Sequence, residues 1–288
     1  MKKRFLFFTL IFIFLFSVTV FAENLSPQAK QVLEKFQNFF KNRGINVKVL
    51  LDKPIPDKNI KLPGYRFVTI KIWKGKRSQT LSFFTDGNYI IRDFEIAGRP
   101  MNLIENFQSE YLVYKVPVSN DEIVFGSPNA KVKVVLFGDF ECPFCKRTLL
   151  FLLEKYKNNK DVVLYFKHYP LPFHRYAKLF SRIYEAGKHV NVNLAEFIEK
   201  LNYKRGEKEE ELKKQILEKV KNLIPSEKWD DFVKYIDNKE IMKKIEKNMT
   251  QGNELGVRAT PTVFINGKKV VGAKLNLIQK LIEENLKK

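Results

Sequence analysis

The chain has 288 residues, of which 44% are hydrophobic and 29% charged, so its composition is that of a globular protein and not of a disordered one. The formal net charge is +20, but lysines alternate with acids, as in Glu209–Lys214, which favours a solvated basic surface. Because no zinc finger, Gly-rich phosphate loop or RNA-binding signature accompanies the charge, we expect no nucleic-acid partner.

Residues 1–22 have the pattern of a signal peptide that is cleaved on export. Lys2, Lys3 and Arg4 form a basic start, an apolar run follows, and Val20 and Ala22 supply small residues before the expected cleavage point. The alternative is a retained N-terminal membrane anchor, because residues 5–22 are just long enough to span a bilayer. Either way we expect the protein in the periplasm or cell envelope.

Residues 23–100 are predicted to form a small α+β domain. Ser26 as N-cap and Pro27 in the first turn predict a helix over 26–42. The β-branched and aromatic segments that follow predict strands over 47–51, 65–73, 79–85 and 89–95. Residues 101–123 are predicted to be a linker, with a helix over 101–114 that runs into an extended piece.

From residue 124 to residue 288 the pattern changes to that of an α/β domain. A strand over 132–137, a helix over 143–157 and a strand over 162–169 predict a βαβ unit. Residues 174–255 are nearly all helical in pattern, which indicates a large helical insertion. A terminal hairpin around Asn266-Gly267 and a closing helix over 275–286 complete the prediction.

The chain has two cysteines, Cys142 and Cys145, and they stand three positions apart at the start of the predicted helix. A bridge between them closes a very short loop and stabilises little, so the pair indicates a chemical role. A helix N-terminus lowers a cysteine pKa from about 8.5, and the thiolate is the species that attacks disulfides. Pro143 suits the first helical turn. We expect Cys142 to attack, Cys145 to resolve, and no cofactor beyond this redox pair.

A metal site or a chance spacing would account less well for the two cysteines. A zinc site needs two further ligands, and His168, His174 and His189 have no ligand spacing, so we expect no metal. Two core cysteines that stand three apart by chance are the second alternative, which the strand–Cys–Pro–helix context disfavours.

The segment Ala259-Thr260-Pro261-Thr262, just before the strand of the terminal hairpin, resembles the cis-proline loop of the thioredoxin superfamily. That resemblance implies that Pro261 packs against the cysteine pair and that Thr260 offers its backbone to a client peptide. The alternative for these residues is an ordinary turn or the start of an edge strand.

Two branches of that superfamily are similar to different parts of the chain. The motifs Phe140–Cys145 and Phe166–Leu171, with His174 just after, resemble the DsbA-like oxidoreductases of bacterial envelopes over about residues 124–288. Residues 24–100 are similar to the cystatin-like dimerisation domain of DsbC and DsbG, which implies a homodimer. The expected fold is therefore a thioredoxin fold with a large helical insertion, preceded by a small α+β domain.

The active-site loop departs from its relatives. Phe144 replaces a polar or glycine residue and cannot donate a hydrogen bond from its side chain, which predicts a Cys142 pKa that is lowered but not extreme. Leu136 stands where some relatives bury an acid that moves the resolving proton. Asp139 and Glu141 are nearby acids that either transfer protons or are simply solvated loop charges.

The leading hypothesis is a disulfide isomerase or reductase that acts on unfolded or misoxidised exported proteins and receives electrons from a membrane redox partner. The first alternative is a DsbA-type oxidase that donates disulfides. The second is a chaperone or binding module whose cysteine pair is incidental.

Overall fold

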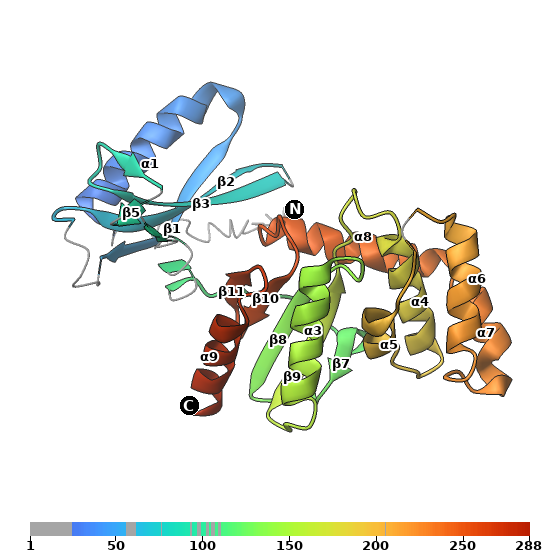
Figure 1. Cartoon of the computed structure of the whole chain (residues 1–288). Coiled ribbons are helices and arrows are strands. Elements are labelled where there is room, and N and C mark those ends of the chain that lie inside the picture. The colour runs from blue at the N-terminus through green and yellow to red at the C-terminus, as the bar shows by residue number, and fades with distance from the viewer. Residues whose placement is uncertain are drawn as a thin grey trace, which may run out of the picture.

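A computed structural model describes residues 25–55, 62–75, 77–92, 94–96, 99–101, 104, 107–108, 111–204 and 206–288. Figure 1 shows two lobes, each built around its own sheet. The predicted signal peptide lies outside the described residues, as do residues 102–103, 105–106 and 109–110 of the predicted linker helix over 101–114. In the part of the chain that is described, no helix is both long and apolar enough to cross a bilayer.

The first lobe is one helix packed on an antiparallel sheet. Its elements are α1 (Pro27–Phe40), the 3-10 turn η1 (Lys41–Arg43), β1 (Asn46–Pro54), β2 (Arg66–Lys74), β3 (Arg77–Thr85) and β4 (Ile90–Ile91), with the strands in the order β1-β2-β3-β4. Ser26 caps α1 as predicted, because its side chain accepts a hydrogen bond from the Ala29 N–H at 3.2 Å. Ala29 and Val32 face Val68 and Phe83 of the sheet, which makes this lobe's core.

The strand predicted over 89–95 is two strands in different sheets. Asp86 Oδ1 accepts hydrogen bonds from the N–H groups of Asn88 and Tyr89, at 2.9 and 2.8 Å, so the chain turns tightly here and pairing with β3 begins only at Ile90. Beyond β4 the chain forms a separate ribbon from β5 (Phe94–Ile96) and β6 (Arg99–Met101).

The second lobe contains the predicted βαβ unit. Its elements are η2 (Asn120–Glu122), β7 (Ile123–Phe125), β8 (Val132–Gly138), α3 (Pro143–Tyr156), β9 (Val162–His168), β10 (Thr262–Ile265), β11 (Lys268–Val271) and α9 (Leu275–Leu286). The strands lie in the order β11-β10-β8-β9-β7; β8 and β9 are parallel and the other pairs antiparallel. This arrangement confirms the predicted thioredoxin fold, and β7 is an added edge strand that the sequence did not predict.

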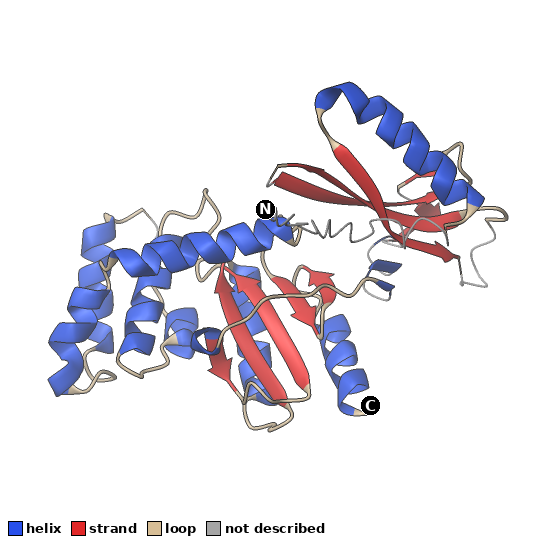
Figure 2. Ribbon diagram, turned by 180° about the vertical axis from the view of Figure 1, so that it is seen from behind, coloured by secondary structure: helices blue, strands red, loops and turns tan. Residues whose placement is uncertain are grey.

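The helical insertion between β9 and β10 is also confirmed. It consists of α4 (Ala177–His189), α5 (Ala195–Lys200), α6 (Glu209–Val220), η3 (Ser226–Lys228), α7 (Trp229–Tyr235) and α8 (Lys239–Glu254). Figure 2 shows α8 as a long helix that runs back from the insertion across the end of the sheet, where it contacts β9. The insertion therefore leaves the sheet next to β9 and returns to it before β10.

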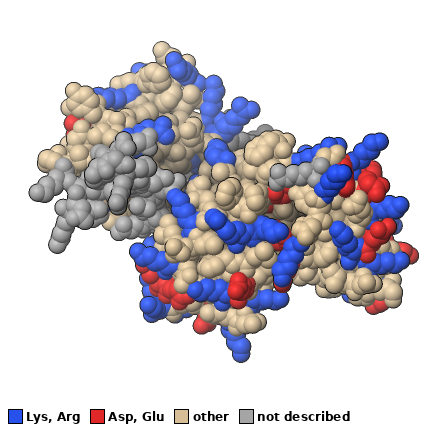
Figure 3. Space-filling model, viewed as in Figure 1, with Lys and Arg blue, Asp and Glu red and all other residues tan. Residues whose placement is uncertain are grey.

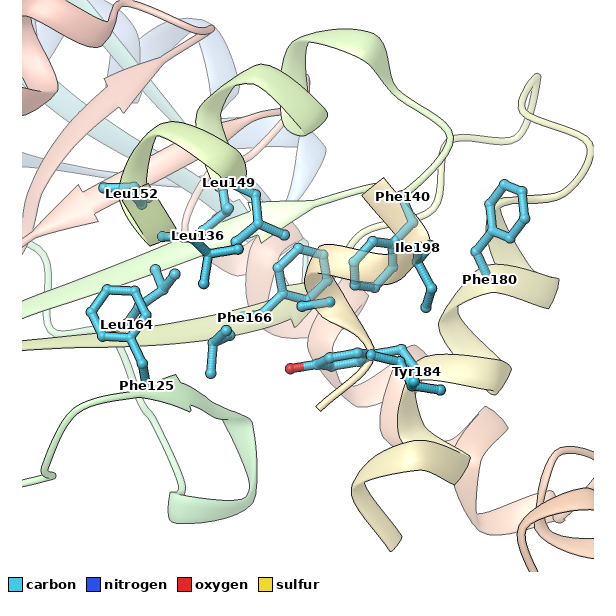
Figure 4. Packing of buried hydrophobic residues seen from close by; sticks show 14 of the residues in the cluster. Phe125, Leu136, Phe140, Leu149, Leu152, Leu164, Phe166, Phe180, Tyr184 and Ile198 are labelled. Carbon is cyan, nitrogen blue, oxygen red and sulfur yellow. The ribbon is translucent and has the colours of Figure 1, made fainter. Parts of the chain in front are cut away.

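One continuous core joins the sheet to the insertion. Phe140 stacks on Phe166 with ring centroids 4.5 Å apart, and Tyr184 of α4 and Ile198 of α5 close around the pair (Figure 4). Leu136 is fully buried in the same core. The buried aromatic side chains thus hold the loop after β8 against α4 and α5.

The segment that leads into the second lobe is fastened to the β10–β11 turn. The Tyr114 N–H donates to the Gly267 carbonyl at 2.8 Å, and the Tyr114 ring packs edge-on against Phe264. Gly267 has φ +84°, and a Cβ there would lie 2.5 Å from the Tyr114 carbonyl oxygen, so the close approach requires glycine.

Charged side chains cover both lobes. Figure 3 shows Lys and Arg scattered over this face, with Asp and Glu among them mainly over the second lobe. The positive side chains on this face are therefore dispersed and do not gather in one stripe.

Candidate active site

The two cysteines lie where β8 passes into α3. Cys142 is the N-cap residue of α3 with extended backbone angles, Pro143 is the first helical residue, and Cys145 lies in the first turn. Both thiols are free. Cys142 is 4% exposed and Cys145 is fully buried, so Cys142 is the sulfur nearer to solvent.

The loop before β10 reaches the same place from more than one hundred residues away. The Thr260–Pro261 peptide bond is cis. The Cys142 thiol donates to the Thr260 carbonyl with a sulfur–oxygen distance of 3.6 Å, and the Pro261 carbonyl accepts from the Gly272 N–H at 2.8 Å. The structure therefore brings Thr260 against Cys142, with Pro261 next to it across the cis bond.

The surroundings favour a thiolate on Cys142 and a thiol on Cys145. The Cys145 S–H lowers the pKa of Cys142 to about 5, helped by the N–H groups of Cys145 and Phe144, although burial opposes the shift. Burial, reinforced by the neighbouring Cys142, raises the pKa of Cys145 well above its ordinary range. Each sulfur thus has the protonation state that its expected role requires.

Phe144 contributes through its backbone and leaves its ring in solvent. The side chain is 56% exposed, and the guanidinium of Arg147 lies 5.8 Å from the ring centre. The Phe144 N–H is one of the groups that lower the Cys142 pKa. The prediction from sequence considered only the Phe144 side chain, which has no donor.

Asp139 is buried and fully committed to hydrogen bonds. Its carboxylate accepts from the N–H groups of Glu141 and Leu171 and from His174 Nδ1, at 2.8, 2.7 and 2.7 Å. Its own N–H donates to Cys145 Sγ at 3.4 Å. Asp139 therefore ties the loop after β9 to the loop that carries the cysteines.

Glu141 likewise binds backbone, because its carboxylate accepts from the Tyr176 N–H at 2.5 Å, just before α4 begins. Asp139 and Glu141 thus have structural partners, and their role in proton transfer stays a prediction. Each histidine also contacts a carboxylate: His174 contacts Asp139, and the others pair as His168–Glu185 and His189–Asp231. Within the described ranges, no three His, Cys, Asp or Glu side chains gather as a metal site would need.

Glu199 is a residue of this region that the sequence pattern did not single out. It lies on α5, is 2% exposed, and lines a cavity of about 270 Å³ together with Cys142, Lys146 and Tyr203. Burial raises the pKa of Glu199 to about 9. Nothing in the sequence separates it from the many other acids of the helical insertion, because only the fold carries α5 to Cys142.

The parallel β8–α3–β9 unit, the cysteine pair at the start of α3 and the cis-proline loop together define a thioredoxin-superfamily thiol–disulfide oxidoreductase. A family model described as thioredoxin matches residues 118–284. The chain therefore belongs to the thioredoxin family.

Individual relatives are similar over the same part of the chain. The probable disulfide bond formation protein D of Bacillus cereus is 30% identical over 172 residues, which cover 57% of this chain and 78% of the relative. Disulfide bond formation protein D of Bacillus subtilis is 28% identical over 181 residues, or 59% of this chain and 80% of that protein. The crystal structure of oxidised BdbD from Bacillus subtilis shares the fold, with a TM-score of 0.51 and 22% identity over 62% of this chain and 99% of that one.

Proposed function

We propose that the protein exchanges disulfides with exported client proteins, with Cys142 as nucleophile and Cys145 as resolving thiol. The observation that carries the proposal is the contrast between the two sulfurs. Cys142 has a pKa of about 5 beside the Cys145 thiol, whereas the pKa of the buried Cys145 is raised. An attacking thiolate and a protonated partner are what a two-step exchange needs.

The exchange follows from this geometry. The Cys142 thiolate attacks one sulfur of a client disulfide, the other client sulfur leaves, and a mixed disulfide forms. Cys145 then loses its proton and attacks Cys142 Sγ, which releases the client dithiol and leaves a Cys142–Cys145 disulfide. The reverse sequence donates a disulfide to the client, and no additional redox cofactor takes part. Thr260 would pair with the client backbone while the sulfurs react.

Oxidation of clients is the direction that the lowered pKa supports best. A stabilised Cys142 thiolate favours the reduced enzyme and so makes its disulfide a better oxidant. The relatives named disulfide bond formation protein D support the same direction. In this scheme a membrane redox partner reoxidises the cysteine pair.

Isomerisation or reduction is the second candidate, and the first lobe favours it. Residues 25–101 add a separate α+β unit that the thioredoxin family model, which begins at residue 118, does not cover. If this unit joins two copies, two cysteine pairs would face a shared client. A redox-independent chaperone is the third candidate, with residues 1–22 as a cleaved signal peptide in every case.

Two measurements separate these candidates. A reduction potential nearer to about −120 mV than to about −270 mV, with oxidative refolding of reduced ribonuclease, would support the oxidase. A homodimer by light scattering that recovers activity from scrambled ribonuclease would support the isomerase. Cys142→Ser should abolish either activity, while Cys145→Ser should accumulate the mixed disulfide; activity retained by Cys142→Ser would contradict the proposal.

A further inference from the structure

Glu199 is buried in a way that costs stability. It is 2% exposed, and neither of its carboxyl oxygens has a hydrogen-bond partner among the described residues. A buried polar group without a partner is expensive, and a buried carboxylate is more so. Glu196, another acid on α5, differs from Glu199 because it is exposed and has a partner: its carboxylate lies 2.6 Å from Lys200 Nζ. Because burying this carboxyl group of Glu199 lowers the stability of the fold, we expect a function that requires it at this position.

Burial keeps Glu199 protonated. Its cavity is lined by Cys142 and Lys146 from the start of α3, by Glu141 from the preceding loop and by Tyr203. Burial raises the pKa of Glu199 to about 9; the Lys146 charge opposes the shift, and the negative charges on Cys142 and Asp139 add to it. Among the described residues that line the cavity, Lys146 is the one cation. At neutral pH Glu199 is thus a neutral carboxylic acid beside a thiolate.

We propose that Glu199 is the general acid that protonates the client sulfur expelled when Cys142 attacks, an inference that rests on the exchange function proposed above. In this step the Cys142 thiolate forms a bond to one client sulfur and the client S–S bond breaks. The electron pair goes to the leaving sulfur, which takes the Glu199 proton and becomes a thiol. Glu199 remains as a carboxylate and is reprotonated from water. In the reverse direction the same carboxylate removes the proton of the attacking client thiol.

The fit between donor and acceptor supports this role. A client docked on Cys142 can place its leaving sulfur in the cavity that Glu199 lines. An alkyl thiol has a pKa of about 8.5, close to the value of about 9 for Glu199, so the proton transfer is nearly balanced in both directions. Asp139 and Glu141 are less suited to this task, because backbone N–H groups already occupy their carboxylates.

The test compares two disulfides that differ in their leaving group. Oxidised glutathione expels an alkyl thiolate that needs a proton, whereas a nitro-aromatic disulfide expels a thiolate that is stable at neutral pH. We expect Glu199→Gln, in the reduced full-length protein, to slow the reaction with oxidised glutathione by about a hundredfold, at the low end of general-acid effects. The reaction with the aromatic disulfide should change less than twofold. Glu196→Gln on the same helix is the matched control and should leave both rates unchanged.

Two results would overturn the inference: equal loss with both disulfides, which indicates a disturbed site, or no loss with either. A second measurement needs no variant. In the wild type, the ratio of the glutathione rate to the aromatic rate should fall as pH rises through about 9, as Glu199 loses its proton, and a flat ratio would also refute the role. If the wild type reacts with neither disulfide, it is the exchange function itself that fails.

Discussion

The hydrogen bond from Cys145 to the Cys142 thiolate can be removed without touching the attacking sulfur. It is the largest single cause of the low Cys142 pKa, so Cys145→Ala should raise that pKa. Hydrogen bonds to charged groups contribute about 1.5–3 kcal/mol, and one pKa unit corresponds to about 1.4 kcal/mol. Because S–H is a weak donor, the lower part of that range applies, and we expect a rise from about 5 to about 6.

Thiolate absorbance at 240 nm, followed against pH in the reduced protein, measures this pKa directly. Cys145→Ser is the matched control, since its hydroxyl keeps a donor at the same position and should hold the pKa within about half a unit of the wild type. An unchanged or lower pKa in Cys145→Ala would refute the assignment. A wild-type value at or above that of a free thiol would refute the whole account of Cys142 as a helix-start thiolate.

Further expectations concern stability. Since the folded-state pKa of Cys142 is lowered, its contribution is present above the unfolded pKa and is lost as pH falls through about 5. In urea unfolding, the reduced form should therefore gain about 2 kcal/mol over the oxidised form between pH 5 and pH 7, which corresponds to about 45 mV in reduction potential; no gain would contradict this. Gly138→Ala should cost about 1–3 kcal/mol in the same assay, because its Cβ would lie 2.6 Å from the Phe166 ring. Lys167→Met and Glu122→Leu should each cost about 3–5 kcal/mol by breaking a buried pair at 2.6 Å. The double variant should lose less than the sum of the two, although it leaves Asn248 and Gln251 without their partners; additive losses would argue against the pairing.

The hydrophobic pattern and the turn residues predicted those helices and strands that bury one face over their whole length. The βαβ unit, the closing helix over 275–286 and the N-cap at Ser26 all follow from local chemistry. Local pattern failed at β7, which has three residues and exists only because β9 offers it an edge. It failed again over 89–95, where the Asp86 side chain uses the Tyr89 N–H that a strand would have paired.

The site divides in the same way. The cysteine pair was predicted because a helix start and its N-cap are adjacent in sequence, and the Thr260–Pro261 loop was predicted from a resemblance. The three hydrogen bonds to the Asp139 carboxylate and the burial of Glu199 depend on loops and a helix that only the folded chain brings together. Such partners leave no periodic signal in one sequence, since any exposed acid of the insertion looks the same as Glu199.

The attachment of Tyr114 to the β10–β11 turn has a mechanical consequence. The Gly267 carbonyl that holds the Tyr114 N–H lies at one end of β10, and Thr260 and Pro261 lie just before the other end. Four residues of strand separate the two points, a span of about 13 Å. If the first lobe moves, the force would act through the Tyr114–Gly267 hydrogen bond along the axis of β10. It would then reach the Thr260–Pro261 loop beside Cys142 at the other end of the strand.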